Sequence, residues 1–204
     1  NVGSHEVLSI EGSALRLTGD GVQLFVSTEK KGISYPSGLE AYLKPGSGVW
    51  TIDRLDAKSI ESLQDSDVKP VLSSRDPQSI HIKDPFLHSD RGHDHLMFCF
   101  HPFGWTSSNT GCAQLNANGE ASEASFDFMP RGFTWDVAMT RATSVLTLPT
   151  LAVGSSVRLV FYDGGECLRN LDEHATAVKR PRGYSCEELG GLAYIQGDGP
   201  DALH

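Results

Sequence analysis

The sequence predicts an all-β fold, on three observations. Apolar and polar residues alternate in short runs along the chain, and polar turns rich in Gly, Pro and Asp separate those runs. A strongly apolar strand recurs near Val22, His95 and Val157, at a spacing of about 60–75 residues. Each of these strands follows a shorter strand-like run, so the pattern indicates repeated antiparallel units.

The first unit is predicted over residues 14–55. Leu15–Thr18 and Val22–Ser27 alternate on either side of a Gly-Asp-Gly turn, which is typical of a β-hairpin. Leu39–Leu43 is predicted as the third strand and Val49–Asp53 as the fourth. Four short strands with tight connections predict one small antiparallel sheet.

The second unit is predicted over residues 80–130. Asp84–His88 and His95–Phe100 form its first two strands around a polar turn, and Cys112–Leu115 and Phe126–Met129 complete the sheet.

The third unit is predicted over residues 140–195, with strands at Thr143–Leu146 and Val157–Tyr162. The segment 56–64 is interpreted as a connector between units, with a short helical turn as the alternative. The segment 168–178 spaces its apolar residues like one face of a helix, and helix and loop both stay open there.

Four-stranded units with long loops favour a β-propeller over a β-sandwich, whose loops are usually shorter than the stretch between Phe100 and Phe126. About three blades fit within residues 1–204, which we treat as one propeller-type domain. A closed propeller has four blades or more, so we expect the propeller to be incomplete, with self-association as one consequence.

Charge and cysteine usage narrow the function classes. The formal net charge is −9 and no dense basic run occurs, which argues against nucleic acid and anionic lipid as partners. No apolar stretch is long enough for a membrane span, so a soluble protein is expected, with the cytoplasm weakly favoured. The four cysteines form no CxxC pair, and Cys99 is predicted to be a buried thiol, although two disulfides stay open.

Two segments carry a family resemblance. Ile82–Leu87 followed by His95–Phe100 resembles a blade opening of the five-bladed β-propeller glycoside hydrolases, which include the arabinanase/xylosidase, invertase and levansucrase families. Trp135–Leu146 followed by Val160–Gly164 is similar to the next blade, in an uncharacterised bacterial branch. The resemblance covers about residues 14–195 and implies five blades in the full fold.

The resemblance also implies catalytic candidates, because glycoside hydrolysis uses two carboxyl groups. In these families an Asp-Pro dipeptide starts the innermost strand and the Asp points into the central pocket. Asp84 would bind sugar hydroxyls and tune the acid, although an Asp that caps a turn before Pro is the alternative. Asp163 could reach the pocket rim or simply form an Asp-Gly turn. Glu166 and Glu173 are candidate proton donors, but neither fits the family's pattern of a Glu at a strand start.

The candidate substrate-binding residues are Arg141, Thr140, His101, Trp105 and Trp135. Arg141 could hold sugar hydroxyls or pair with Asp84, unless it faces outward in a salt bridge. The tryptophans could stack on sugar faces, although aromatic residues in propellers often pack between blades. His93 and His95 are spaced like metal ligands but lack a third, so no metal or cofactor is predicted.

The sequence thus predicts a glycoside hydrolase-like protein that cleaves or binds a carbohydrate. Two alternatives stay open: a carbohydrate-binding or scaffold propeller without catalysis, and an unrelated small all-β binding domain.

Overall fold

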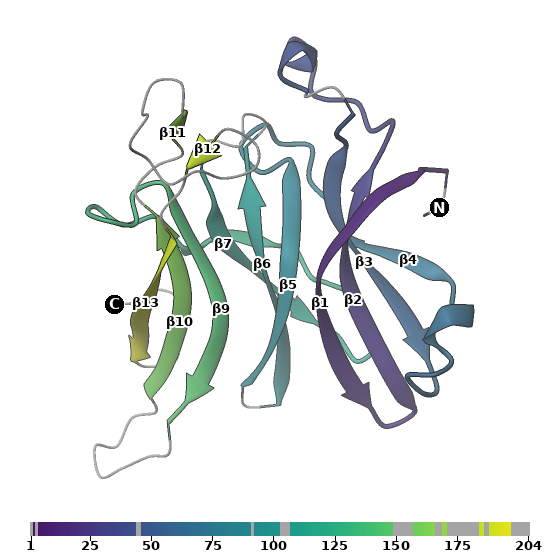
Figure 1. Cartoon of the computed structure of the whole chain (residues 1–204). Helices are drawn as coiled ribbons and strands as arrows, with labels where there is room; N and C mark the ends of the chain where they lie inside the picture. Colours follow the sequence, from purple (N-terminus) through teal and green to yellow (C-terminus); the bar gives the residue numbers. More distant parts are fainter. Residues whose placement is uncertain are drawn as a thin grey trace.

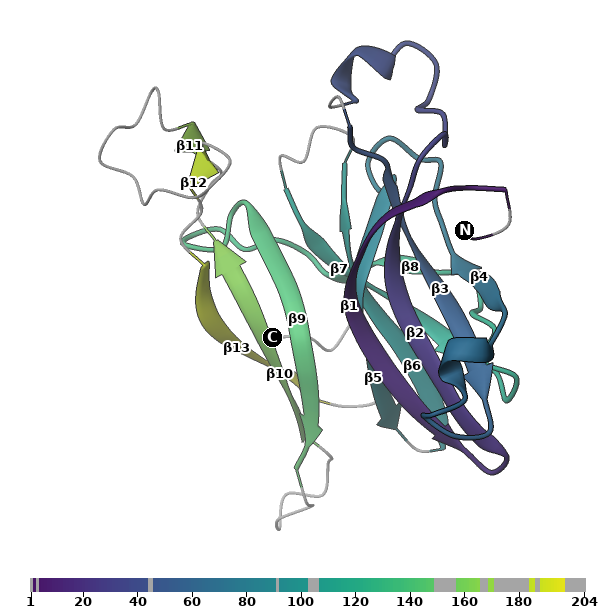
Figure 2. The ribbon, with the colours of Figure 1, turned by 45° about the vertical axis from the view of Figure 1, so that its right-hand side comes forward.

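Three antiparallel β-sheets stand side by side in chain order, with strand orders β1-β2-β3-β4, β5-β6-β7-β8 and β13-β10-β9 (Figures 1 and 2). The all-β prediction is confirmed. The computed structural model describes residues 2, 4–43, 46–90, 92–102, 107–148, 157–165, 169–170, 184–185 and 188–196.

The first sheet contains β1 (Val7–Thr18), β2 (Gly21–Lys30), β3 (Val49–Ala57) and β4 (Val68–Leu72). The predicted hairpin and the strand at Val49–Asp53 are confirmed. β4 was not predicted. It is an edge strand, the position in a sheet where its Pro70 can be accommodated.

The predicted strand at Leu39–Leu43 is wrong. Its centre forms a single 3₁₀ turn, η1 (Glu40–Tyr42). Leu39 and Leu43 pack together on a small core made by Tyr35, Val49 and Ile80, so their spacing of four residues serves a turn.

The segment 56–64 is also corrected. It leads from β3 into a second 3₁₀ turn, η2 (Leu63–Asp65), and on to β4, so it connects two strands of one sheet rather than two sheets.

The second sheet contains β5 (His81–Asp90), β6 (His93–His101), β7 (Asn109–Leu115) and β8 (Ser125–Met129), which confirms all four predicted strands. β5 begins at His81, ahead of the expected start at Asp84. Asp84 therefore lies within the strand, at a shift of register between Lys83 and Phe86.

The third sheet contains β9 (Met139–Thr147), β10 (Val157–Gly165) and β13 (Glu188–Gln196). Between β10 and β13, the strands β11 (Arg169–Asn170) and β12 (Tyr184–Ser185) pair with each other. The remainder of the predicted helical stripe at 168–178 lies outside the described residues.

Apolar side chains fill the space between neighbouring sheets. Phe25 and Ile52 of the first sheet pack against Ile82, Leu96 and Phe98 of the second, and all five are essentially inaccessible to water. A second core joins the other pair of sheets through Met129, Ala142, Val160 and Ile195. β3 and β6 are each buried over six consecutive residues, so both faces of these strands are covered by the protein.

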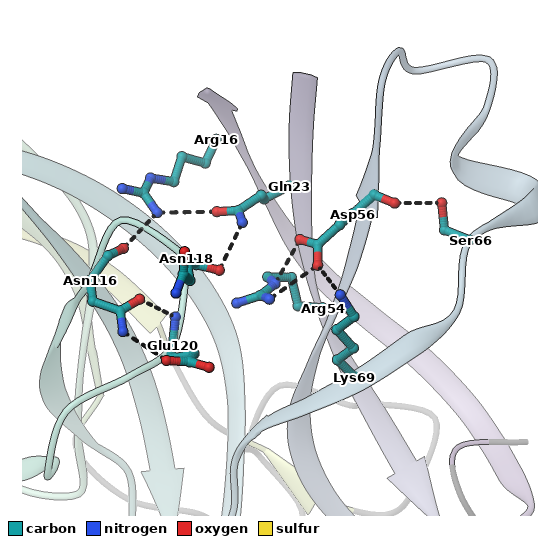
Figure 3. Close-up of polar contacts among 9 residues, drawn as sticks. All are labelled: Arg16, Gln23, Arg54, Asp56, Ser66, Lys69, Asn116, Asn118 and Glu120. Atoms are coloured by element: carbon teal, nitrogen blue, oxygen red, sulfur yellow. Dashed lines mark hydrogen bonds and ion pairs between the residues drawn. The ribbon is translucent and has the colours of Figure 1, made fainter. Parts of the chain in front are cut away.

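Polar contacts reinforce the junction between the first two sheets (Figure 3). Gln23 Nε2 donates to the Asn118 carbonyl at 3.0 Å, and Arg16 donates to the Asn116 carbonyl at 3.1 Å. The connection from β7 to β8 therefore docks on β1 and β2.

In the described part of the chain, no helix is long and apolar enough to cross a membrane.

Candidate functional site

Asp84 is the one non-glycine residue with a positive φ, +54°, among the described residues. Its backbone N–H donates to Ser27 Oγ at 2.8 Å, and the Cys99 thiol donates to its Oδ2 at 3.2 Å. The side chain keeps 35% of its surface exposed. A carboxylate held in an unfavourable backbone conformation, yet open to solvent, is a frequent feature of functional sites.

Lys83 places a positive charge beside this carboxylate. Its Nζ lies 2.9 Å from Glu11 Oε2 on β1 and 3.7 Å from Asp84 Oδ2. It also lies 5.3 Å from the centre of the Trp50 ring. Burial acts to lower the pKa of Lys83, but Asp84, Cys99 and Glu11 more than offset burial, so the pKa is raised and the ammonium stays charged.

Arg141 brings a second cation from the third sheet. It is the register partner of Asp163 on β10 and donates to Glu188 Oε2 on β13 at 2.6 Å. Burial acts to lower its pKa, whereas Cys99, Glu188, Asp84 and Asp163 raise it, with a net increase. The charges of Asp84 and Arg141 therefore act on each other across two sheets.

Two buried residues of β6, Cys99 and His101, lie next to these charged groups. His101 Nε2 lies 3.5 Å from the Cys99 sulfur, and its Nδ1 lies 3.0 Å from the Ser107 carbonyl oxygen. Burial, followed by the positive charges of Lys83 and Arg141, lowers the pKa of His101 well below its usual value, so the ring is neutral at pH 7. Burial also raises the pKa of Cys99, which keeps it a thiol. Cys99 is buried, as predicted.

We call Glu11, Lys83, Asp84, Arg141, Asp163 and Glu188, together with the neutral Cys99 and His101 beside them, the charged cluster. Its members come from all three sheets, and β5 contacts both β1 and β9. Carboxylates accept hydrogen bonds, and the guanidinium of Arg and the ammonium of Lys donate them. A cluster that contains all three groups can therefore bind several hydroxyl groups at once.

Two predicted residues make contacts with other parts of the protein. Thr140 is 1% exposed, and its hydroxyl donates to the Met129 carbonyl at 3.2 Å. Trp135 stacks on Tyr162 with ring centres 5.7 Å apart. Each side chain therefore has a partner within the protein.

The predicted residues Glu166, Glu173 and Trp105 lie outside the described residues. Asp163 is described, and it lies within β10 rather than in a turn, because the strand continues to Gly165.

Sequence reasoning missed Glu11, Lys83 and Glu188. Lys83 stands next to Asp84, so its sequence position could have suggested it. Glu11 reaches Lys83 through the packing of the first sheet on the second, and Glu188 reaches Arg141 across β10 within the third sheet. A single sequence carries no signal for either contact.

Two other features of the molecule stand apart from the charged cluster. Lys30, Thr51 and Asp53 form a buried polar group in the first sheet, in which Lys30 Nζ lies 2.7 Å from Asp53 Oδ1. Its partners satisfy one another, as buried charges require. A shallow groove of about 380 Å³ between Asn109 and Phe133 has no lining residue in common with the cluster.

Among the described residues, no three potential metal ligands gather in one place. His93, one of the two histidines with ligand-like spacing, instead has its Nδ1 2.9 Å from Gln114 Nε2.

Solved structures provide the comparison. Zg3597, a family 117 glycoside hydrolase from the marine bacterium Zobellia galactanivorans, matches the chain with a TM-score of 0.56 and 12% identity. The match covers 100% of this chain and 58% of that one. The chain has part of a propeller fold. At this identity the likeness concerns the fold alone, and the chain spans little more than half of the structure that it matches.

A provisionally assigned glycoside hydrolase from Parabacteroides distasonis also matches, with a TM-score of 0.48 and 9% identity over 96% of this chain and 71% of that one. No protein-family model and no curated protein matches the chain.

Proposed function

We propose that this chain is part of a glycoside hydrolase-like propeller that binds a carbohydrate at the charged cluster and cleaves its glycosidic bond with Asp84 as one of the carboxyl groups. The observation that carries the proposal is the placement of Asp84. Asp84 lies on β5, the first strand of the second sheet, and it combines a positive φ and a partly exposed carboxylate with two nearby cations, Lys83 and Arg141.

The chemistry of the cluster supports a carbohydrate ligand. Sugar hydroxyls both donate and accept hydrogen bonds, and the cluster offers carboxylate acceptors beside the donors Lys83 and Arg141. The fold supports the same class, because the matched Zobellia structure is a glycoside hydrolase. Asp163 is the second described carboxylate that we assign to the reaction, and Glu166 and Glu173 remain our proposed proton donors.

A carbohydrate-binding propeller without catalysis is the second candidate. It is favoured by the pairing of Glu11 with Lys83 and of Glu188 with Arg141, since carboxylates held in this way serve as hydrogen-bond acceptors.

Hydrolysis of a panel of neutral aryl glycosides tests the catalytic proposal. We expect Asp84→Asn to lower kcat/KM on the responsive substrate by about 100-fold or more, because it removes the carboxylate that would bind sugar hydroxyls and tune the pKa of the proton donor. Asp20→Asn, in the exposed turn between β1 and β2, is the matched control and should leave the rate unchanged.

Binding of neutral oligosaccharides, followed by amide NMR shifts, separates the two candidates. Shifts at Lys83, Asp84 and Arg141 without hydrolysis would support the binding propeller. Hydrolysis that survives Asp84→Asn would remove Asp84 from the mechanism. Neither hydrolysis nor shifts at the cluster would refute both candidates.

A further inference from the structure

The conformation of Asp84 depends on residues of the neighbouring sheet. Asp84 belongs to β5, but its N–H is held by Ser27 of β2, and its carboxylate faces Gly12 of β1. A single sheet therefore does not build this site by itself.

Gly12 leaves the space that the carboxylate occupies. A Cβ atom placed on Gly12 would lie 2.8 Å from Asp84 Oδ1 and 3.0 Å from Asp84 Cα. Real Cβ atoms essentially never come as close to another atom as 2.8 Å, so the carboxylate would have to shift. The second contact, at 3.0 Å, is tight and involves backbone, which yields less readily than a flexible side chain. Gly12 itself has a φ of +47°, at a shift of register between Glu11 and Ser13. Irregular positions in β1 and β5 thus face each other.

Cys99 holds the opposite side of the same carboxylate. Its sulfur is 3.2 Å from Asp84 Oδ2, and its side chain is buried. Because the thiol stays protonated, it can act as a hydrogen-bond donor to the carboxylate at neutral pH.

We infer that Gly12 and Cys99 are positioning residues for Asp84: Gly12 sets how far the carboxylate extends toward the first sheet, and the Cys99 thiol anchors its other oxygen. This inference rests on the proposed function for its purpose, because the carboxylate it positions is the one assigned to the carbohydrate. The geometry can be tested without any carbohydrate.

The S–H stretching band of Cys99 in the infrared spectrum reports the thiol–carboxylate hydrogen bond directly. Its assignment follows from the band that Cys99→Ala removes. Asp84→Asn replaces the anionic acceptor with a weaker neutral one, so we expect the band to move to higher frequency. Gly12→Ala should move it in the same direction, because the added Cβ displaces the carboxylate.

Gly32→Ala is the matched control. Gly32 also has a positive φ, +80°, but a Cβ there meets nothing within 4 Å, so the variant carries backbone strain without displacing Asp84. Its Cys99 band should stay at the wild-type frequency. If Gly12→Ala fails to fold, Ser27→Ala takes its place, since it removes the 2.8 Å hydrogen bond that holds the Asp84 backbone.

A band that moves no further in Gly12→Ala or Ser27→Ala than in Gly32→Ala would overturn the inference. The band shifts are independent of catalysis, so they can be observed even if the glycoside panel shows no turnover and the proposed function fails. Where hydrolysis is found, Gly12→Ala should lower kcat by about 100-fold with little change in KM, as expected for a misplaced reacting group.

Discussion

At the scale of single residues, Asp84 combines a conformational cost with solvent access. The left-handed region disfavours residues with a Cβ by about 1–2 kcal/mol, and Asp84 occupies it at a φ of +54°. The contacts with Ser27, Cys99 and Lys83 hold it there. The contacts from two sheets thus offset the free-energy cost of this backbone conformation. Such strained residues are common at sites where the exact position of a side chain matters for function.

The cost can be measured by comparing two substitutions at one position. Asp84→Gly and Asp84→Ala both remove the carboxylate, but only glycine relieves the backbone. We expect Asp84→Gly to have a free energy of unfolding about 1 kcal/mol higher than Asp84→Ala, measured by urea denaturation.

The same pair at Asp20 provides the control, because Asp20 lacks a positive φ. There the glycine variant should be no more stable than the alanine variant. Equal free energies of unfolding for the two Asp84 variants would show that the backbone of Asp84 is not strained.

At the scale of elements, the connection from β7 to β8 brings Gly119 close against the first sheet. Gly119 has a φ of +77°, and a Cβ there would lie 2.5 Å from Gln23 Oε1 and 2.6 Å from Arg54 NH1. Both partners are tied into the network of Figure 3, where Arg54 pairs with Asp56 and Gln23 binds Asn118. The junction therefore has little room to adapt.

Gly119→Ala should lower the free energy of unfolding by about 2–3 kcal/mol, through backbone strain together with disruption of the junction. Urea denaturation measures it. Gly38→Ala separates the two causes: Gly38 has a φ of +87°, but its Cβ would meet nothing within 4 Å, so about 1 kcal/mol is expected there. A loss at Gly119 no larger than the loss at Gly38 would argue against a tight junction.

At the scale of the whole molecule, four histidines link stability to pH. The pKa values of His81, His88, His95 and His101 are all lowered, in each case first by burial. For His81 the value falls to about 3. His81 lies between the Tyr35 hydroxyl, 3.0 Å from its Nε2, and the Trp50 amide, which donates to its Nδ1 at 3.4 Å. Unfolding exposes these rings to water and restores their ordinary affinity for protons.

Stability should therefore fall as the pH drops below about 6.5, because the unfolded chain then binds more protons than the folded one. Each histidine that stays neutral in the folded protein lowers the free energy of unfolding by about 2 kcal/mol when the pH drops from 7.5 to 5. Urea denaturation at these two values measures the fall. His81→Gln should reduce it by about 2 kcal/mol, and an unchanged fall in that variant would exclude His81 as a contributor.

The outer faces of the first and third sheets expose apolar side chains to solvent, and the faces between sheets do not. The third sheet exposes Phe161, Leu192 and Tyr194, and β1 exposes Ile10 and Leu17, whereas the apolar side chains between sheets are buried. The match to 58% of a propeller chain agrees with this arrangement, in which the sheets resemble consecutive blades.

The sequence by itself determined the fold class and most of the strands. Alternating or continuous apolar runs, with turn residues at their ends, are local signals, so β2, β6 and β10 could be predicted from their own residues. It also singled out Asp84 and Arg141. The prediction of a strand at Leu39–Leu43 was wrong, because over five residues the two-residue alternation of a strand cannot be told from the four-residue spacing of apolar residues in a turn.

Only the tertiary structure decided what surrounds Asp84. Gly12, Cys99 and Arg141 lie far from one another in the sequence, and their meeting depends on strand register and on how sheets pack. The same packing directed Thr140 and Trp135 into contacts with the protein itself. Alternation specifies which face of a strand is apolar, but the neighbours of a polar side chain across a sheet boundary follow from the whole fold.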